Sequence, residues 1–476
     1  MKENGLPREG KLIGMEQARM EQAMFEQVVD LARRYRERVP KQPVFPRVSV
    51  DDLRRALGGP LPEGGEDSAA VISHLARGAE PGLVGSTGPR YFGFVIGGSL
   101  PVTTAADWLA VAWDQNAGLY ATSPAVSVVE EVAAVWLREL FGLPAKTSVG
   151  FVTGGGPANF TAMVIARHGV LQRAGWDVEQ DGLQGAPRVH VVVSDEAHAT
   201  IFTALRMAGL GARVVKRVPT DAQGRMIASE LPAILATCDG PTIVCAQAGN
   251  VNTGSFDPMD AIADATSSHG AWLHVDGAFG LWATVSDKLR PLIRGVERAD
   301  SWAVDAHKWL NVPYDSGLVL CAHPDLHRAA LSVRAEYLVH TEADRERDNF
   351  EWVPEFSRRA RGFAVYAAIR HLGRKGITEL IERCCARARQ MAELLRGQPG
   401  VEILNDVVLN QVLVRFHASD ERTRAVIERV QRDGVCWLGG TTWHGLAAMR
   451  ISVSNWSTTE RDIQMSAESI LRAAGA

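Results

Sequence analysis

The chain contains 476 residues, and its 51 basic and 55 acidic side chains leave a formal net charge of −4. Apolar residues make up 46% and charged residues 22%, which is typical of a folded globular protein and argues against general disorder. The near-neutral charge gives no basic surface for nucleic acid, so we expect no such partner. No apolar run reaches the ~20 residues that a membrane helix needs, so we expect no membrane association. The N-terminal sequence MKENGLPREGKLIGMEQ has no apolar signal core, which favours a cytoplasmic protein.

The N-terminal part predicts helices. Apolar side chains recur at helical spacing over residues 14–38, with charges on the other faces. Stretches rich in Pro and Gly, KQPVFPRV and GGPLPEGGED, follow this helix. We therefore expect residues 1–87 to form an N-terminal helical arm. Residues 102–141 also predict helix, with a break at Ser123-Pro124.

An alternation of short apolar runs and helical stretches begins near residue 149. The strand candidates are residues 149–153, 189–194, 242–248, 271–276, 301–305 and 317–322. Fully apolar strands separated by helices predict an α/β fold with a mostly parallel sheet and helices on both faces, which we assign to a large domain over residues 88–330.

A polar stretch, EYLVHTEADRERDNFEW, follows the large domain and predicts a loop or short helix. Residues 359–373 then predict a helix, and residues 412–416 and 448–454 predict strands. We assign residues 331–476 to this loop and a smaller C-terminal α+β domain.

Cysteine and lysine are sparse and informative. The six cysteines contain no CxxC pair, so we expect reduced thiols and neither a disulfide framework nor a metal site.

Most of the eight lysines lie in polar or turn-like stretches, whereas Lys308 lies between an apolar run and Trp-Leu. A buried ammonium is costly unless it is paired or used in chemistry, so Lys308 is a candidate catalytic residue.

A glycine loop follows the first strand candidate of the large domain. TGGGPANF (153–160) opens a helix, so the backbone amides near Gly155 and Gly156 are available to an anion. The pattern matches neither GxGxxG nor GxxxxGK[ST]. A tight strand-to-helix turn and a nucleotide-binding loop therefore remain alternatives.

Polar residues close three further strand candidates. Asp276 ends AWLHVD, His198 follows VVVSDEA, and DAHKW places Asp305, His307 and Lys308 after SWAVD. Strand ends of open α/β sheets face the ligand crevice. Each residue alone has a structural alternative: a turn-capping Asp, a hydrogen-bonded core His or a solvated Lys.

Together these residues suit one cofactor. Pyridoxal phosphate needs a phosphate cradle, a lysine for its Schiff base, a carboxylate facing its pyridine nitrogen and a flat group over its ring. The glycine loop, Lys308, Asp276 and His198 supply these in one architectural setting. A nucleotide-binding module would leave Lys308 unexplained.

The sequence resembles the pyridoxal-phosphate-dependent group II amino-acid decarboxylases, which include aromatic L-amino acid and glutamate decarboxylases. HVDGAFG and DAHKWLNVPYDSG are similar to the family's HVDAA and HKW elements, VVSDEAHAT to its SDxAH segment and FVTGGGPAN to its TSGGTEAN loop. The resemblance runs from about residue 88 to the C-terminal ISVSNWSTTERDI. It implies fold type I, the aspartate aminotransferase-like architecture.

The resemblance also implies residue roles. Lys308 matches the Schiff-base lysine and Asp276 the carboxylate facing the ring nitrogen, while His198 and Ala278 match the residues on the two ring faces. The positions matching phosphate contacts are Gly155, Gly156, Asp305 and His307. Ser357 matches a position that reaches the partner subunit's phosphate. Asn250 occupies a position where relatives often carry a threonine near the cofactor. The family's dimers place their sites at the interface and clasp each other with N-terminal helices, so a homodimer is expected.

Two departures from the family pattern bear on the reaction. Gly156-Pro157 replaces a hydroxyl and an acidic residue, which leaves phosphate binding to backbone amides. The loop tyrosine that protonates the family's carbanion aligns with Asn349, next to Phe350, and Tyr337 lies upstream. Relatives that lack this tyrosine divert the carbanion to oxygen and yield an aldehyde.

We therefore expect a carboxy-lyase that acts on an L-amino acid. Tyr91, Phe92 and Phe94 lie in the segment that lines the family's substrate pocket. They suit an aromatic or bulky apolar substrate, with core aromatics as the alternative. An aldehyde synthase, a transaminase, a carbon–carbon lyase and a non-catalytic pyridoxal-phosphate-binding protein remain alternatives on the same scaffold.

Overall fold

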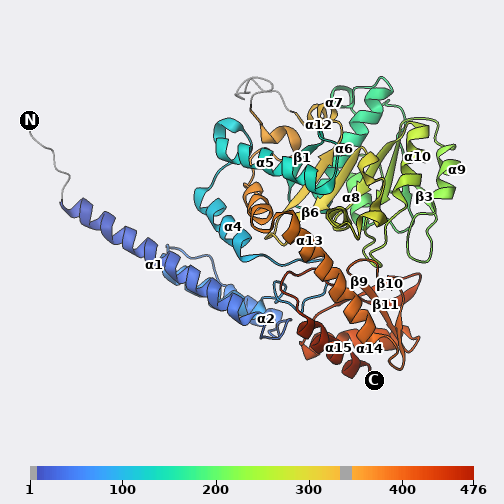
Figure 1. Cartoon of the computed structure of the whole chain (residues 1–476). Coiled ribbons are helices and arrows are strands. Elements are labelled where there is room, and N and C mark those ends of the chain that lie inside the picture. The colour runs from blue at the N-terminus through green and yellow to red at the C-terminus, as the bar shows by residue number, and fades with distance from the viewer. Residues whose placement is uncertain (1–7, 333–345, 476) are drawn as a thin grey trace, which may run out of the picture.

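The computed structural model describes residues 8–332 and 346–475. Its helices are α1 (Arg8–Arg38), α2 (Val50–Leu57), α3 (Ser68–Ala79), α4 (Pro101–Trp113), α5 (Pro124–Phe141), α6 (Gly155–Arg173), α7 (Val178–Asp181), α8 (Ala199–Met207), α9 (Leu231–Leu235), α10 (Met259–His269), α11 (Ala306–Trp309), α12 (Pro324–Leu331), α13 (Gly362–Leu395), α14 (Asp420–Asp433) and α15 (Glu460–Ala474). Figure 1 shows α1 extending away from a body that contains a large α/β unit and a smaller unit near the C-terminus.

A seven-stranded sheet forms the centre of the large unit. Its strands are β1 (Ser148–Val152), β2 (His190–Ser194), β3 (Lys216–Val218), β4 (Thr242–Gln247), β5 (Trp272–Asp276), β6 (Ser301–Asp305) and β7 (Gly317–Cys321). Their order is β1-β7-β6-β5-β4-β2-β3, and β7 alone runs antiparallel to its neighbours β1 and β6. The six predicted strands are thereby confirmed. The sequence analysis missed β3, because KRV is a short and polar edge strand.

Helices cover both faces of this sheet, as its apolar strands predict. Successive side chains of a strand point to opposite faces. Val192 and Val244 accordingly join the core under α5, α10 and α13, whereas Val191 and Val193 join the core under α6 and α8. The sheet is therefore buried on both sides, and ligands reach it only at its strand ends.

The smaller unit contains a four-stranded antiparallel sheet with the order β10-β11-β9-β8. Its strands are β8 (Val401–Ile403), β9 (Gln411–Phe416), β10 (Gly439–Trp443) and β11 (Leu446–Ser452). β9 and β11 agree with the predicted strands, whereas β8 and β10 were not predicted. The helix predicted over 359–373 continues to Leu395, because α13 bends at Gly373 (φ 60°) and then resumes. The proposed domain boundaries at residues 87 and 330 stay predictions.

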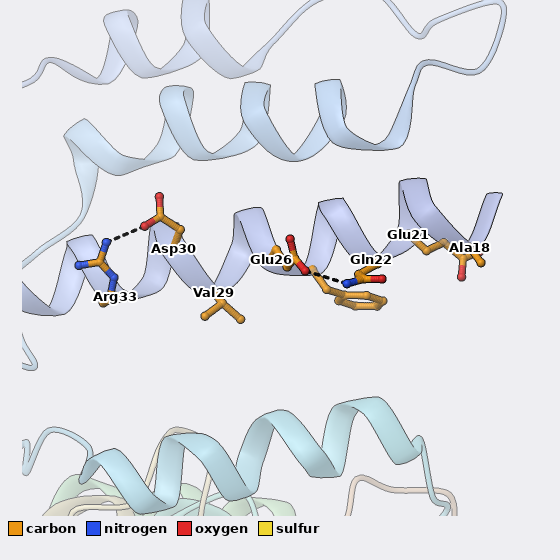
Figure 2. Close-up of a pocket in the computed structure, with 8 residues that line it drawn as sticks. Ala18, Glu21, Gln22, Glu26, Val29, Asp30 and Arg33 are labelled. Atoms are coloured by element: carbon orange, nitrogen blue, oxygen red, sulfur yellow. Dashed lines mark hydrogen bonds and ion pairs between the residues drawn. The ribbon is translucent and has the colours of Figure 1, made fainter. Parts of the chain in front are cut away.

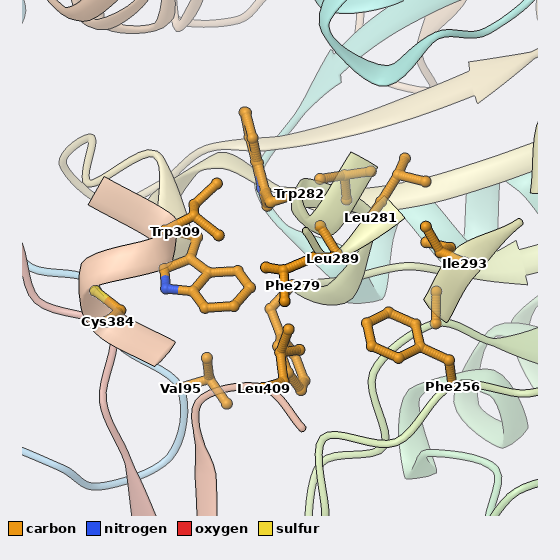
Figure 3. Close-up of a cluster of buried hydrophobic side chains, with 14 of the residues drawn as sticks. Val95, Phe256, Phe279, Leu281, Trp282, Leu289, Ile293, Trp309, Cys384 and Leu409 are labelled. Carbon is orange, nitrogen blue, oxygen red and sulfur yellow. The ribbon is translucent and has the colours of Figure 1, made fainter. Parts of the chain in front are cut away.

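A cluster of large buried side chains joins the two units (Figure 3). Trp309 is fully buried, and its ring meets that of Phe279 edge-on at 6.1 Å between centroids. Leu409 of the smaller unit belongs to the same cluster. Close-packed interiors resist displacement, so this cluster fixes the backbone that carries Lys308.

Candidate active site

The predicted site residues converge on one edge of the large sheet. β1, β2, β4, β5 and β6 all run in the same direction, since β7 is antiparallel to both β1 and β6. Their carboxyl ends therefore face the same crevice. Asp276 ends β5 and Asp305 ends the neighbouring β6, while the glycine loop follows β1 and His198 follows β2.

Lys308 lies in α11, directly beyond the end of β6. Its Nζ is 2.8 Å from Asp305 Oδ2, and its side chain is 20% exposed. The ammonium also lies 5.9 Å from the centroid of the Phe279 ring. Lys308 is therefore a partly buried amine at the crevice and not a solvated surface lysine.

The glycine loop contacts Asp305. The Gly155 N–H donates to Asp305 Oδ1, and a Cβ built on Gly155 would lie 2.7 Å from Asp305 Oδ2. A larger residue would close this space, which explains glycine at 155. The loop opens α6, a helix of 19 residues whose N-terminus favours an anion.

His307 and Ser316 lie next to this loop. His307 Nε2 is 3.4 Å from Asp305 Oδ1, and His307 Nδ1 accepts the Ser316 N–H at 3.3 Å. Burial lowers the pKa of His307, although Asp305 acts in the opposite direction. The buried Ser316 hydroxyl has no partner among the described residues, so it is an available donor that the sequence analysis missed.

Asp276 is held in the crevice by two hydrogen bonds. Its carboxylate is buried, accepts the Ala278 N–H at 3.2 Å and accepts Asn159 Nδ2 at 3.1 Å. Ala278 in turn accepts the Asp305 N–H at 2.8 Å through its carbonyl. These bonds hold the ends of β5 and β6 together. Asn159, on α6, was not singled out by the sequence because its role depends on a tertiary contact.

His198 is the N-cap of α8. Its Nδ1 accepts the Thr200 N–H at 3.3 Å and lies 2.8 Å from Thr200 Oγ1. Burial lowers the pKa of His198, while the Asp276 carboxylate acts in the opposite direction. The histidine is thus both a structural cap and a crevice residue.

Asn250 presents an unsatisfied donor. Its Oδ1 accepts the N–H groups of Asn252 and Thr253 at 2.8 and 3.2 Å. Its buried Nδ2 has no partner among the described residues. A buried unpaired donor costs about 1–3 kcal/mol, so a ligand atom at this position would be favoured.

The three predicted pocket aromatics divide into two groups. Tyr91 and Phe94 stack on Trp437, with centroid distances of 5.1 and 5.9 Å, and Phe94 is 60% exposed. Phe92 is fully buried in the main hydrophobic core, which fits the core alternative for this residue. The ring of Tyr314 lies 4.4 Å from that of His307. Trp437 and Tyr314 were not predicted.

Arg450 brings a cation from the smaller unit to the crevice. It lies on β11, its Nη1 donates to Asn252 Oδ1 at 3.4 Å, and its charge acts to lower the pKa of His198. Burial lowers the pKa of Arg450 itself. Sequence reasoning missed it because nearly 200 positions separate it from Asn252.

The two loop positions, Ser357 and Asn349, lie in different surroundings. Ser357 is exposed, and its hydroxyl accepts Asn116 Nδ2 at 3.2 Å. Asn349 is fully buried in a short 3-10 turn, Asn349–Trp352, where its Oδ1 accepts Arg347 Nε at 2.7 Å. This position is therefore folded into the body. Tyr337 lies outside the described residues.

No cluster of three or more His, Cys, Asp or Glu side chains in residues 8–332 and 346–475 is arranged to hold a metal ion. No helix within the described part of the chain has the length and apolar character required to cross a lipid bilayer.

The site fits pyridoxal phosphate on the chemistry of its donors and acceptors. A lysine amine, a buried carboxylate, a helix N-terminus with a free hydroxyl beside it and the unsatisfied Asn250 amide lie on one sheet edge. This arrangement and the mixed sheet define a fold type I enzyme of the pyridoxal-phosphate class. The profile of the "Pyridoxal-dependent decarboxylase conserved domain" matches residues 51–418, and the chain belongs to this family.

Relatives agree with this assignment. Tryptophan decarboxylase 1 of Oryza sativa subsp. japonica is 29% identical and aligns over 93% of this chain and 91% of its own length. Aromatic-L-amino-acid decarboxylase of Bacillus atrophaeus is 27% identical, with 92% of each chain covered. The structure of Oryza sativa TDC with PLP and tryptamine has a TM-score of 0.89 at 25% identity, covering 95% of this chain and 97% of that one. The chain is a pyridoxal-phosphate-dependent amino-acid decarboxylase, a carboxy-lyase.

Proposed function

We propose that this enzyme decarboxylates an L-amino acid with an aromatic or bulky apolar side chain. The observation that carries the proposal is the aromatic stack of Tyr91, Phe94 and Trp437, in which Tyr91 is buried and Phe94 is exposed, since stacked rings favour a flat apolar ligand. The names of the rice and Bacillus relatives, a tryptophan and an aromatic-L-amino-acid decarboxylase, support the same substrate class.

The chain's own residues would hold the cofactor as follows. Lys308 would bind it covalently, and Asp276 would face its ring nitrogen. His198 and Ala278 would lie against its two ring faces, with Asn250 nearby. The backbone amide of Gly156 would contact its phosphate, with Gly155, Asp305, His307 and Ser316 beside it, while the Gly155 N–H is held by Asp305. When bound, pyridoxal phosphate supplies an electron sink for the pair left at the substrate Cα.

Lys308 and Arg450 would then handle the proton and the carboxylate. Once the substrate amine has displaced Lys308 from the cofactor, the Lys308 amine would be free to carry a proton within the crevice. Arg450 would orient the substrate carboxylate, because a partly buried guanidinium with few partners favours an anion.

Replacing Arg450 with methionine tests this orientation. A methionine keeps most of the side-chain volume but removes the charge, so we expect KM to rise at least about tenfold, as is typical of a lost charge-assisted contact. The measurement is steady-state carbon dioxide release at varied substrate. An Arg422→Met variant on the outer helix α14 is the control. An unchanged KM would contradict the assignment.

An aldehyde synthase is the second candidate, favoured by the buried Asn349 in place of a loop tyrosine. Incubation of the enzyme with a panel of ¹⁴C-carboxyl amino acids, followed by product identification, distinguishes the two. We expect carbon dioxide and amine in equal amounts. Carbon dioxide with aldehyde, ammonia and hydrogen peroxide would identify the enzyme as an aldehyde synthase instead of an amine-forming decarboxylase. A keto acid without carbon dioxide would indicate a transaminase, and no product at all a binding protein.

We also propose that the enzyme is a homodimer with its sites at the interface. α1 extends from the body, and Figure 2 shows Val29 and its neighbours on a face that no other helix covers closely. Phe25 is 64% and Val29 50% exposed on α1, and Val111 and Trp113 are exposed on α4. Large exposed apolar patches mark protein interfaces. The exposed Ser357 suits a role toward the partner's phosphate. Light scattering should give twice the 51.6 kDa chain mass.

The cysteines support our proposal of a cytoplasmic enzyme. All six lie in described residues, are buried and are unpaired. Free thiols are typical of reducing compartments.

A further inference from the structure

A one-way chain of buried hydrogen bonds connects the core to the crevice. We propose that this chain fixes His198 as a neutral imidazole with its proton on Nε2, and that Asn159 is the positioning residue that couples His198 to Asp276. The inference rests on the proposed function only for the position of His198 over the cofactor ring, and it adds the protonation state of that histidine.

The inner end of the chain is formed by Trp272, Ser301 and His274. The indole of Trp272 can only donate, and its Nε1–H reaches Ser301 Oγ at 2.9 Å. The Ser301 oxygen accepts this bond and keeps its own hydrogen for His274 Nδ1, which lies 3.0 Å away. Burial lowers the pKa of His274 to about 3, against a smaller opposing effect of the Ser301 backbone. His274 is therefore neutral and carries a single ring proton.

Asn159 divides the chain into two branches. Its Oδ1 accepts His274 Nε2–H at 2.9 Å. Its Nδ2 donates one hydrogen to Asp276 Oδ2 and the other to Thr200 Oγ1, both at 3.1 Å. Asn159 is fully buried, and its amide uses both N–H groups and one lone pair of its oxygen.

The Asp276 carboxylate excludes the flipped orientation of the Asn159 amide. A carboxylate oxygen only accepts, so Asn159 Oδ1 turned toward Asp276 would place two acceptors in contact. It would also leave the two N–H groups facing a histidine that already donates. The Asp276 carboxylate thus fixes the amide, and the amide fixes the tautomer of His274.

The second branch ends at His198. Thr200 Oγ1 accepts from Asn159, so its own hydrogen is free to reach His198 Nδ1 at 2.8 Å. The Thr200 backbone N–H also points to Nδ1 at 3.3 Å and can only donate. Two donors facing one nitrogen leave no place for a proton there. His198 therefore carries its proton on Nε2 and offers the crevice a donor, not a base.

The surrounding charges agree with a neutral ring. Burial is the largest effect on the pKa of His198, and it lowers that pKa. The charged groups that act on the ring come from β5, β6, α11 and β11: Asp276, Asp305, Lys308 and Arg450. Two carboxylates are thus opposed by two cations.

The test measures the ring nitrogens of His198 directly. The full-length protein is labelled with ¹⁵N-histidine, loaded with pyridoxal phosphate, and His198 is assigned with a His198→Gln variant. At neutral pH we expect an unprotonated Nδ1 and a protonated Nε2. A protonated Nδ1, alone or together with Nε2, would overturn the proposal. Since no turnover is needed, this outcome is independent of whether the proposed substrate class is right.

Variants of Asn159 test the coupling. Asn159→Asp offers Thr200 an acceptor in place of a donor, so its hydroxyl turns away from His198, and the added negative charge should raise the midpoint of the His198 titration by about one pH unit or more. Asn159→Ala, which adds no charge, should move it in the same direction by less. Trp272→Phe is the control, because Ser301 still donates to His274, and it should leave the His198 signals unchanged. Folded Asn159 variants with a wild-type titration would refute the coupling.

Discussion

Lys308→Ala is expected to abolish turnover and the covalent hold on pyridoxal phosphate. The amine is proposed to bind the cofactor aldehyde and to carry a proton afterwards, and proton transfer alone contributes roughly 10²–10⁴-fold. We therefore expect a loss of more than about a thousandfold in kcat. The visible absorption of the purified protein should lose its imine character, and borohydride should no longer fix the cofactor to the chain.

Lys288→Ala is the matched control for this loss. Lys288 is also a lysine paired with a carboxylate, Glu382, but its side chain is 79% exposed. It should retain wild-type turnover and cofactor content. Measurable decarboxylation by Lys308→Ala at more than a tenth of the wild-type rate would reject the covalent role of Lys308.

Asp276→Asn is expected to keep the fold and the cofactor but to lose most of the rate. The asparagine oxygen can still accept the Ala278 N–H, whereas the negative charge that would pair with a protonated ring nitrogen is gone. Removing one preorganised electrostatic contact of this kind costs about 10²–10³ in kcat. We expect the loss to appear in kcat more than in KM, because the charge matters most when electrons move into the ring.

The control for this variant is Asp300→Asn. Asp300 also accepts a backbone N–H, from Leu273 at 2.7 Å, and pairs with His323, but it precedes β6 and lies away from the crevice. Its loss should change stability and not the rate. Equal kcat values for Asp276→Asn and wild type would remove Asp276 from the catalytic set.

The strand-end residues could be found in the sequence because their signals are local. Lys308, Asp276 and His198 each follow an apolar run, and parallel strands bring such positions to one edge. Arg450, Trp437 and Ser316 could not be found in this way. Trp437 and Arg450 act through contacts between distant segments, on Tyr91 and beside Asn252, and Ser316 is noticed only because its buried hydroxyl has no partner among the described residues.

The fold followed the same rule. Buried strands were predicted from continuous apolar residues, whereas β3 and β8 are three-residue edge strands with no such pattern. The end predicted for α13 at 373 reflects a real bend, because Gly373 has a positive φ. The helix continues past it, since packing against α15 stabilises the second half.

That bent helix has a consequence for how the enzyme diversifies. Its first half packs against α4 and α5, while its second half packs against α15 and the smaller unit that bears Arg450. Arg450, proposed to bind the substrate carboxylate, and Lys308, proposed to bind the cofactor, therefore lie on different units, which are joined by α13 and by the buried cluster around Trp309. Substitutions in the smaller unit can therefore change which amino acids are accepted while the residues proposed to hold the cofactor stay the same.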